Sequence, residues 1–310
     1  MAICFVFPGQ GSQAVGMGRA LYDQFDSVKK LYAVASESLG YDVAKLSFEG
    51  PAGELNKTHI TQPCLLTASS AACMVLAEKG ITPAIVAGHS LGEYSALVAA
   101  GSIAFRDAVK IVGVRGKIMQ EAVPAGTGLM AAVLGIDRAR LDEICAGVTE
   151  GYVGAANYNC PGQIVIAGEK AAVEAAMAKA KEAGAKRAIP LAVSVPSHCK
   201  LMEDVGSKFV EVLNAYAVSD AQVRFFNNVD AREVSAARDI RASLVRQLSR
   251  PVLWEDCVKT IEALGGTTFI EVGPGKVLTG LIKRIAPDAK CFNVEDSDSL
   301  IKAIEGLNQQ

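Results

Sequence analysis

Apolar residues occur along the chain in two patterns. Short unbroken runs of strand length, such as AICFVF at residues 2–7, predict buried β-strands. Longer runs with apolar positions three and four residues apart, such as the run at 105–122, predict helices with one buried face. The run at 61–80 predicts a long buried helix that begins near Thr61 and Pro63. Because strands and helices alternate along most of the chain, the pattern favours an α/β fold with a mostly parallel sheet.

The order of the elements changes in the middle of the chain. Residues 127–196 predict strand, helix, strand, strand, helix and strand, which is the order of a ferredoxin-like unit. The last of these strands is expected to cover RAIPLAVSV at 187–195. We therefore expect a small ferredoxin-like subdomain at 127–196, inserted into a large α/β subdomain formed by 1–126 and 197–310.

The sequence GHSLG at 88–92 is the clearest chemical signal. It lies between a predicted strand that ends at Ala87 and a predicted helix that begins at Glu93, which is the context of a nucleophile elbow. The flanking glycines allow a sharp turn, because neither carries a Cβ atom. The Ser90 hydroxyl is then expected to stand above the sheet as a nucleophile. The alternative is a chance match in an ordinary loop.

Composition narrows the class of protein. Half of the 310 residues are hydrophobic and the formal net charge is −2, which indicates a globular protein and argues against nucleic acid as a partner. We find no unbroken run of about twenty apolar residues, so no membrane span is expected. The eight cysteines form no C-x-x-C pair, which favours free thiols in the cytoplasm. No metal-ligand spacing is present, and neither a metal nor a cofactor is expected.

A serine nucleophile needs a base, and the three histidines are the candidates. His89 adjoins Ser90, so its side chain is expected to point elsewhere across the turn. His59 lies in a polar stretch, NKTHIT, which favours a role at a helix end or at the surface. His198 follows a predicted strand and is the best candidate, although an isolated histidine at a strand end is usually an ordinary residue.

The first loop also allows an interpretation from another class of protein. Gly9, Gly11 and Ala14 directly follow a predicted strand and match a loose dinucleotide-binding fingerprint. That fingerprint needs a second strand that ends in an acidic residue about twenty residues later. The segment 27–39 is helical in pattern instead, which argues against a nicotinamide enzyme.

Several motifs together resemble one family over nearly the whole chain. The sequence is similar to the malonyl-CoA:acyl carrier protein transacylases of bacterial-type fatty acid synthesis. The motifs that carry this resemblance are FPGQGSQAVGMG at 7–18, GHSLGEYSAL at 88–97, VGVRGKIMQ at 112–120, NYNCPGQIVIAG at 157–168, VPSH at 195–198, NNVD at 227–230 and QLSRPVLW at 247–254.

The resemblance implies a fold and a set of site residues. The fold is a hydrolase-like α/β core with a mostly parallel sheet and an inserted ferredoxin-like subdomain. Ser90 is implied as the acylated nucleophile and His198 as its base, with the carbonyl or the side chain of Gln247 orienting the imidazole. The backbone N–H groups of Gln10 and Leu91 are implied as the oxyanion hole.

Arg115 is implied as the residue that selects the substrate. A guanidinium can hold the free carboxylate of a malonyl group with two parallel hydrogen bonds, although most arginines on helices are simply solvated. The implied partners are malonyl-CoA and acyl carrier protein, and the protein is expected to be a monomer. A serine thioesterase or esterase remains the alternative, but no convincing acidic residue lies between Ser90 and His198 in the usual triad order.

Overall fold

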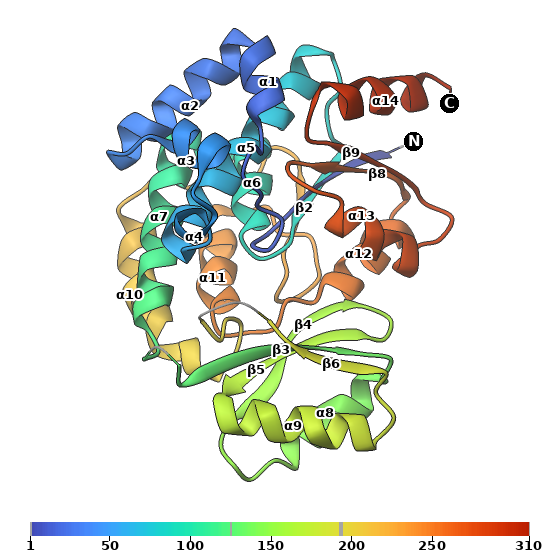
Figure 1. Cartoon of the computed structure of the whole chain (residues 1–310). Helices are drawn as coiled ribbons and strands as arrows, with labels where there is room; N and C mark the ends of the chain where they lie inside the picture. The colour runs from blue at the N-terminus through green and yellow to red at the C-terminus, as the bar shows by residue number, and fades with distance from the viewer. Residues whose placement is uncertain (1, 125, 192–194, 310) are drawn as a thin grey trace.

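The protein has a large lobe and a small lobe, each built on its own sheet (Figure 1). This computed structural model describes residues 2–124, 126–191 and 195–309. Both ends of the chain lie on the large lobe, and the small lobe is formed by the middle of the chain (Figure 1). The architecture agrees with the predicted α/β fold. The division at 127 and 196 stays our prediction for the limits of the subdomains.

The sheet of the large lobe is wholly parallel and has the strand order β7-β2-β1-β8-β9. The central strand β1 lies between β2 and β8, and its last residue, Phe7, is in register with Gly88 at the end of β2. The loops after these two strands therefore start side by side at one edge of the sheet. The strands are β1 (Ala2–Phe7), β2 (Ile85–Gly88), β7 (Arg224–Phe226), β8 (Gly266–Val272) and β9 (Lys290–Val294).

Alternation along β1 divides the core into two layers. Phe5 and Phe7 belong to one buried cluster, and Cys4 and Val6 belong to another on the opposite face. The helices that contribute to the first cluster are α1 (Arg19–Gln24), α2 (Asp26–Leu39), α3 (Val43–Glu49), α4 (Ala52–Leu55), α5 (Thr58–Glu78), α6 (Gly92–Ala99), α7 (Phe105–Glu121), α10 (Glu203–Asn214), α11 (Ala237–Gln247) and α14 (Ser297–Asn308). Those of the second cluster are α12 (Trp254–Ala263) and α13 (Val277–Ile285).

The small lobe has the topology predicted for it. Its antiparallel sheet has the order β4-β5-β3-β6, and two helices pack on it, which together make a ferredoxin-like unit. The described part of its last strand ends at Pro190, and residues 192–194 of the predicted strand lie outside the described residues. The elements are β3 (Gly128–Leu134), α8 (Arg138–Ala146), β4 (Val153–Cys160), β5 (Gln163–Glu169), α9 (Lys170–Glu182) and β6 (Arg187–Pro190).

Helix α5 begins earlier than its sequence pattern predicts. It starts at Thr58, so the predicted start near Thr61 is wrong by three residues, and Pro63 lies inside the helix. The polar residues Thr58 and His59 resemble a loop in sequence, but they lie where α7 packs against this end of α5. Tertiary packing therefore extends the helix beyond its local signal.

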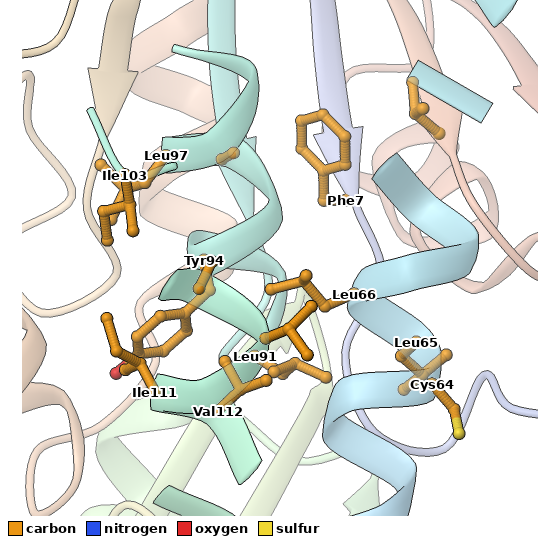
Figure 2. Close-up of a cluster of buried hydrophobic side chains, with 14 of the residues drawn as sticks. Phe7, Cys64, Leu65, Leu66, Leu91, Tyr94, Leu97, Ile103, Ile111 and Val112 are labelled. Carbon is orange, nitrogen blue, oxygen red and sulfur yellow. The ribbon is translucent and has the colours of Figure 1, made fainter. Parts of the chain in front are cut away.

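Helix α5 is also long and apolar enough to span a bilayer by length and composition, although we expected no such segment. In the structure, 78% of its most apolar window is buried inside the protein. Figure 2 shows Leu65 and Leu66 of this helix in a cluster with Leu91, Tyr94 and Phe7. The helix thus supports the turn at the end of β2 from within the core.

We predict that the α5–α7 contact depends on Gly116. A Cβ atom at this position would lie 2.6 Å from the Cα atom of His59 and 2.8 Å from the carbonyl oxygen of Thr58. Overpacking of this kind costs roughly 1–3 kcal/mol, so Gly116→Ala should lower the free energy of unfolding by about that amount in urea denaturation.

The matched control is Gly280→Ala in α13, where a Cβ atom would meet nothing within 4 Å. That change should raise the free energy of unfolding by about 0.5–1 kcal/mol, because alanine favours a helix more than glycine does. Equal effects of the two substitutions would contradict the proposed contact.

Candidate active site

Ser90 lies at a sharp turn between β2 and α6. Its φ angle is 52°, in the left-handed region that non-glycine residues rarely adopt. The flanking glycines are required by close backbone contacts: a Cβ atom on Gly88 would lie 1.9 Å from the carbonyl carbon of Gly92, and one on Gly92 would lie 2.0 Å from the carbonyl oxygen of Phe7. The turn is therefore a nucleophile elbow of the predicted kind, packed against the end of β1.

Asn228 holds this strained turn from the loop after β7. The backbone N–H of Ser90 donates to Asn228 Oδ1 over 2.7 Å, and Asn228 Nδ2 donates to the carbonyl oxygen of Gly88, also over 2.7 Å. One side-chain amide thus bridges the backbone on both sides of the turn. Asn228 had no predicted role, because nothing local in NNVD points to the elbow.

His198 lies between Ser90 and Gln247. The distance from Ser90 Oγ to His198 Nε2 is 2.7 Å, and the distance from His198 Nδ1 to the backbone carbonyl oxygen of Gln247 is also 2.7 Å. A carbonyl oxygen can only accept a hydrogen bond, so Nδ1 carries the proton and Nε2 is free to accept the proton of Ser90. Of the two possibilities left open for Gln247, its carbonyl is the group that contacts the imidazole.

The imidazole of His198 is held in its neutral form. Burial, followed by the positive charge of Arg115, lowers the pKa of His198 to about 3, and the hydrogen bond to Gln247 opposes this shift. Only 4% of the His198 surface is exposed. A neutral imidazole with a free Nε2 is the form that can act as a general base toward Ser90.

Arg115 lies in α7 and is buried, with 1% of its surface exposed. Its Nη1 donates to Gln62 Oε1 over 2.9 Å, and its Nη2 donates to Gln247 Oε1 over 3.0 Å. The Nη2 atom also lies 3.5 Å from Ser90 Oγ, and the guanidinium lies over the ring of Tyr94. Arg115 is therefore part of the environment of Ser90 and is not a solvated helix residue.

Two of the residues that hold this arrangement had no predicted role. Gln62 comes from α5 and contacts Arg115, as described above. Glu93 follows GHSLG and is buried. Its Oε1 accepts the backbone N–H of Asn228, and its Oε2 accepts Gln247 Nε2. Burial raises the pKa of Glu93, and the hydrogen bond from Asn228, the charge of Arg115 and the hydrogen bond from Gln247 oppose this shift. The sequence offered one signal for Glu93: it is the charged residue at the start of the otherwise uncharged run EYSALVAAG, which indicates a buried acid with partners.

The loop after β1 lies against the elbow. A Cβ atom on Gly9 would lie 2.4 Å from the carbonyl oxygen of His89, which shows how closely the backbone before Gln10 approaches the turn. The N–H of Ser90 is already bonded to Asn228, so an oxyanion at this site needs other donors. Leu91 follows Ser90 and precedes the first residue of α6, and Gln10 follows Gly9; the role of their N–H groups as oxyanion donors stays a prediction.

The other two histidines contact different parts of the molecule. His89 Nε2 lies 2.9 Å from Oδ1 of Asn159 in β4, and the His89 ring packs edge-on against Trp254. The elbow thus touches the small lobe through His89. His59 lies in the first turn of α5, next to Gly116 of α7. Neither histidine makes the contacts to Ser90 and Gln247 that His198 makes.

The dinucleotide interpretation finds no support in this geometry. The segment after the first loop forms the helices α1 and α2, and the next strand in the chain is β2, which leads into the elbow. The glycines after β1 lie against a serine turn. The contact with this turn explains why glycine follows β1, without any need for a bound dinucleotide.

Comparison with known proteins identifies the family. Residues 4–296 match the family described as the acyl transferase domain. Two proteins named malonyl CoA-acyl carrier protein transacylase, from Bacillus subtilis and Escherichia coli K12, are 49% and 50% identical to this chain. The alignments cover 99% and 97% of this chain and 98% of each relative.

Solved structures agree over the same length. An acyl carrier protein S-malonyltransferase from Vibrio cholerae has a TM-score of 0.96 at 48% identity, covering 98% of this chain and 100% of that one. A malonyl-transacylase solved in complex with its type II PKS acyl-carrier protein has a TM-score of 0.97 at 50% identity, covering 99% and 100%. The chain therefore belongs to the acyl transferase domain family and, within it, to the malonyl CoA-acyl carrier protein transacylases.

Proposed function

We propose that this protein transfers a malonyl group from malonyl-CoA to the phosphopantetheine thiol of acyl carrier protein, through a malonyl ester of Ser90. The observation that carries the proposal is the hydrogen bond between Ser90 and the neutral His198, with the buried guanidinium of Arg115 3.5 Å from the serine oxygen. The acyl carrier protein belongs to fatty acid or polyketide biosynthesis. Two features distinguish this site from that of a serine esterase: a backbone carbonyl, and not an acidic side chain, orients His198, and a buried arginine lies beside the serine.

The reaction proceeds in two balanced halves. Ser90 Oγ attacks the thioester carbonyl and gives its proton to His198 Nε2, while the backbone N–H groups of Gln10 and Leu91 stabilise the oxyanion. The C–S bond then breaks, and the proton passes from His198 to the sulfur of coenzyme A. The thiol of acyl carrier protein repeats these steps in reverse. A thiol has a pKa of about 8.5, so a thiolate is a good leaving group. The protonated form of His198 therefore does not need the strong stabilisation that an acidic residue gives to the histidine of a usual triad.

Arg115 gives the site its preference for malonyl groups. The bonds to Gln62 and Gln247 use one N–H on each Nη atom. The second N–H of Nη1 remains, and that of Nη2 makes only a long contact of 3.5 Å to Ser90 Oγ. The buried Nε also has no hydrogen-bond partner among the described residues. A carboxylate one carbon beyond the serine ester can therefore be held bidentately, which also keeps it away from His198.

Hydrolysis is the competing function for the same elbow. A thioesterase passes the acyl group to water and usually relies on an acidic partner for histidine. Here the imidazole Nδ1 of His198 bonds to the Gln247 carbonyl. If malonyl-CoA and acyl carrier protein gave free malonate as the main product, the transferase proposal would have to be replaced by this one.

We also propose that the protein acts as a monomer in the cytoplasm. Ser90, His198, Gln247 and Arg115 contact one another within a single chain, which supports this proposal. The eight cysteines are free thiols, and six of them are buried, which suits a reducing compartment.

Ser90→Ala should abolish formation of the acyl-enzyme. Intact-mass measurement after mixing with malonyl-CoA should show a malonyl adduct on the native protein and none on the variant, because no other nucleophile contacts His198 Nε2 in the described structure. Transfer to acyl carrier protein should fall at least ~10³-fold. The exposed serine Ser207 offers a control, and Ser207→Ala should form the adduct normally. An adduct on Ser90→Ala would refute the proposed nucleophile.

Arg115→Ala should reduce the preference for malonyl-CoA over acetyl-CoA. The loss of hydrogen bonds to a charged group costs about 1.5–3 kcal/mol, which corresponds to roughly a 10- to 100-fold change in the ratio of acylation rates. Arg115→Lys should give an intermediate ratio, since it keeps the charge but loses the bidentate geometry. The selectivity argument fails if Arg115→Ala retains the native ratio.

Acylation should remain active at acidic pH. The pKa of His198 is lowered to about 3, so its base form persists well below the ordinary histidine value of about 6.5. Single-turnover kcat/KM for malonyl-CoA should stay level from pH 7.5 down to about pH 5, where the substrate carboxylate is still mostly ionised. A decline centred near pH 6.5 would show instead that the imidazole titrates as an exposed histidine does.

A further inference from the structure

Glu93 takes no part in the proton transfers, yet it joins the two residues that hold the site together. One of its carboxyl oxygens accepts the backbone N–H of Asn228, whose side chain bridges the Ser90 turn. The other accepts Gln247 Nε2. Only 1% of the Glu93 surface is exposed. A buried carboxyl group therefore lies where the loop after β7 and the end of α11 meet the elbow.

The contacts of Gln247 allow only one orientation of its side-chain amide. Nε2 donates to Glu93 and to the carbonyl oxygen of Ser90, the latter over 2.9 Å, while Oε1 accepts from Arg115 Nη2 over 3.0 Å. A guanidinium can only donate hydrogen bonds, and both Glu93 oxygens already face donors. Turning the amide over would place N–H groups against the guanidinium of Arg115 and a carbonyl oxygen against Glu93.

The amide also keeps Arg115 available for a substrate. Both Nη atoms of Arg115 are held by neutral amide oxygens, from Gln62 and Gln247, and the carboxyl group of Glu93 lies one residue further away. A carboxylate in direct contact would occupy the same N–H groups that an incoming carboxylate needs. The Gln247 amide between Arg115 and Glu93 holds the guanidinium in place. The remaining N–H groups of the guanidinium stay available for a substrate carboxylate.

We propose that Glu93 is a positioning residue for the malonyl carboxylate: through the Gln247 amide it holds the Arg115 guanidinium beside Ser90. This inference rests on the proposed function, since it concerns the same acyl group. Glu93 itself contacts no reacting atom. We expect Glu93 to affect mainly the preference for malonyl over acetyl groups, and to affect the rate of attack by Ser90 less.

The test is Glu93→Gln, a nearly isosteric change that also removes a buried acid. Its carbonyl oxygen can still accept the Asn228 N–H, but its NH2 group then faces Gln247. The Gln247 amide must turn to accept it, which presents an N–H to Arg115. The ratio of malonyl to acetyl acylation rates should fall about tenfold or more, as expected for a lost hydrogen bond to a charged group. The loss should be mainly in KM for malonyl-CoA, with acetyl acylation changed only a few-fold.

Glu271→Gln is the matched control for the loss of a buried carboxylate. Glu271 in β8 is fully buried, and its oxygens accept the backbone N–H groups of Leu278 and Thr279 at the start of α13, on the other side of the sheet. This variant should lose stability and keep the native ratio of malonyl to acetyl acylation. An equal loss of the ratio in both variants would overturn the proposal, and so would an unchanged ratio in Glu93→Gln.

A second variant covers the case in which Glu93→Gln fails to fold. Glu93→Asp keeps the carboxylate but is one methylene shorter, so it cannot reach Asn228 and Gln247 together, and its ratio should fall in the same direction. The Ser90→Ala and Arg115→Ala measurements separate this inference from the proposed function. If those two variants behave as expected while Glu93→Gln and Glu93→Asp retain the native ratio, only the role of Glu93 is refuted.

Discussion

The left-handed backbone of Ser90 is the constraint on which the rest of the site depends. A non-glycine residue in this region costs on the order of 1–3 kcal/mol, so surrounding contacts must hold it there. Asn228, 138 residues away in the chain, supplies two of these contacts, and the close approach of Gly92 to Phe7 supplies another. The direction of the serine hydroxyl is thus a property of the assembled sheet edge and not of the pentapeptide alone.

The charged groups around this turn, Arg115 and Glu93, do not form a direct ion pair with each other. Burial, together with the charge of Arg115, lowers the pKa of His198 and so keeps the base neutral, while the Gln247 amide separates Arg115 from Glu93. The region beside Ser90 therefore carries positive charge that is only partly balanced. Such an environment favours an acyl group with a carboxylate of its own, whose binding completes the balance.

The elbow was predictable because its signal is local. Five consecutive residues between a strand and a helix specify the turn, and the scarcity of histidines led to His198 as the base. Arg115 was a weaker prediction, since its helix alone does not show that the side chain is buried. The resemblance to known transacylases decided it.

The residues that sequence analysis missed act through contacts between distant segments. Gln62 meets Arg115 across the α5–α7 packing, and Glu93 meets Gln247 across 154 residues of the chain. The early start of α5 has the same cause, because Thr58 and His59 are helical where they pack against Gly116. Local pattern carries no information about such pairs until the fold brings them together.

The hydrogen bond from His198 to the carbonyl of Gln247 has a consequence for how the site can vary. Every amino acid carries a backbone carbonyl, so no substitution at position 247 deletes the group that orients the base. In a triad with an aspartate, a single codon change removes that partner. The side chain of Gln247 can therefore serve Arg115 and Glu93, while the course of the main chain alone sets the orientation of the base.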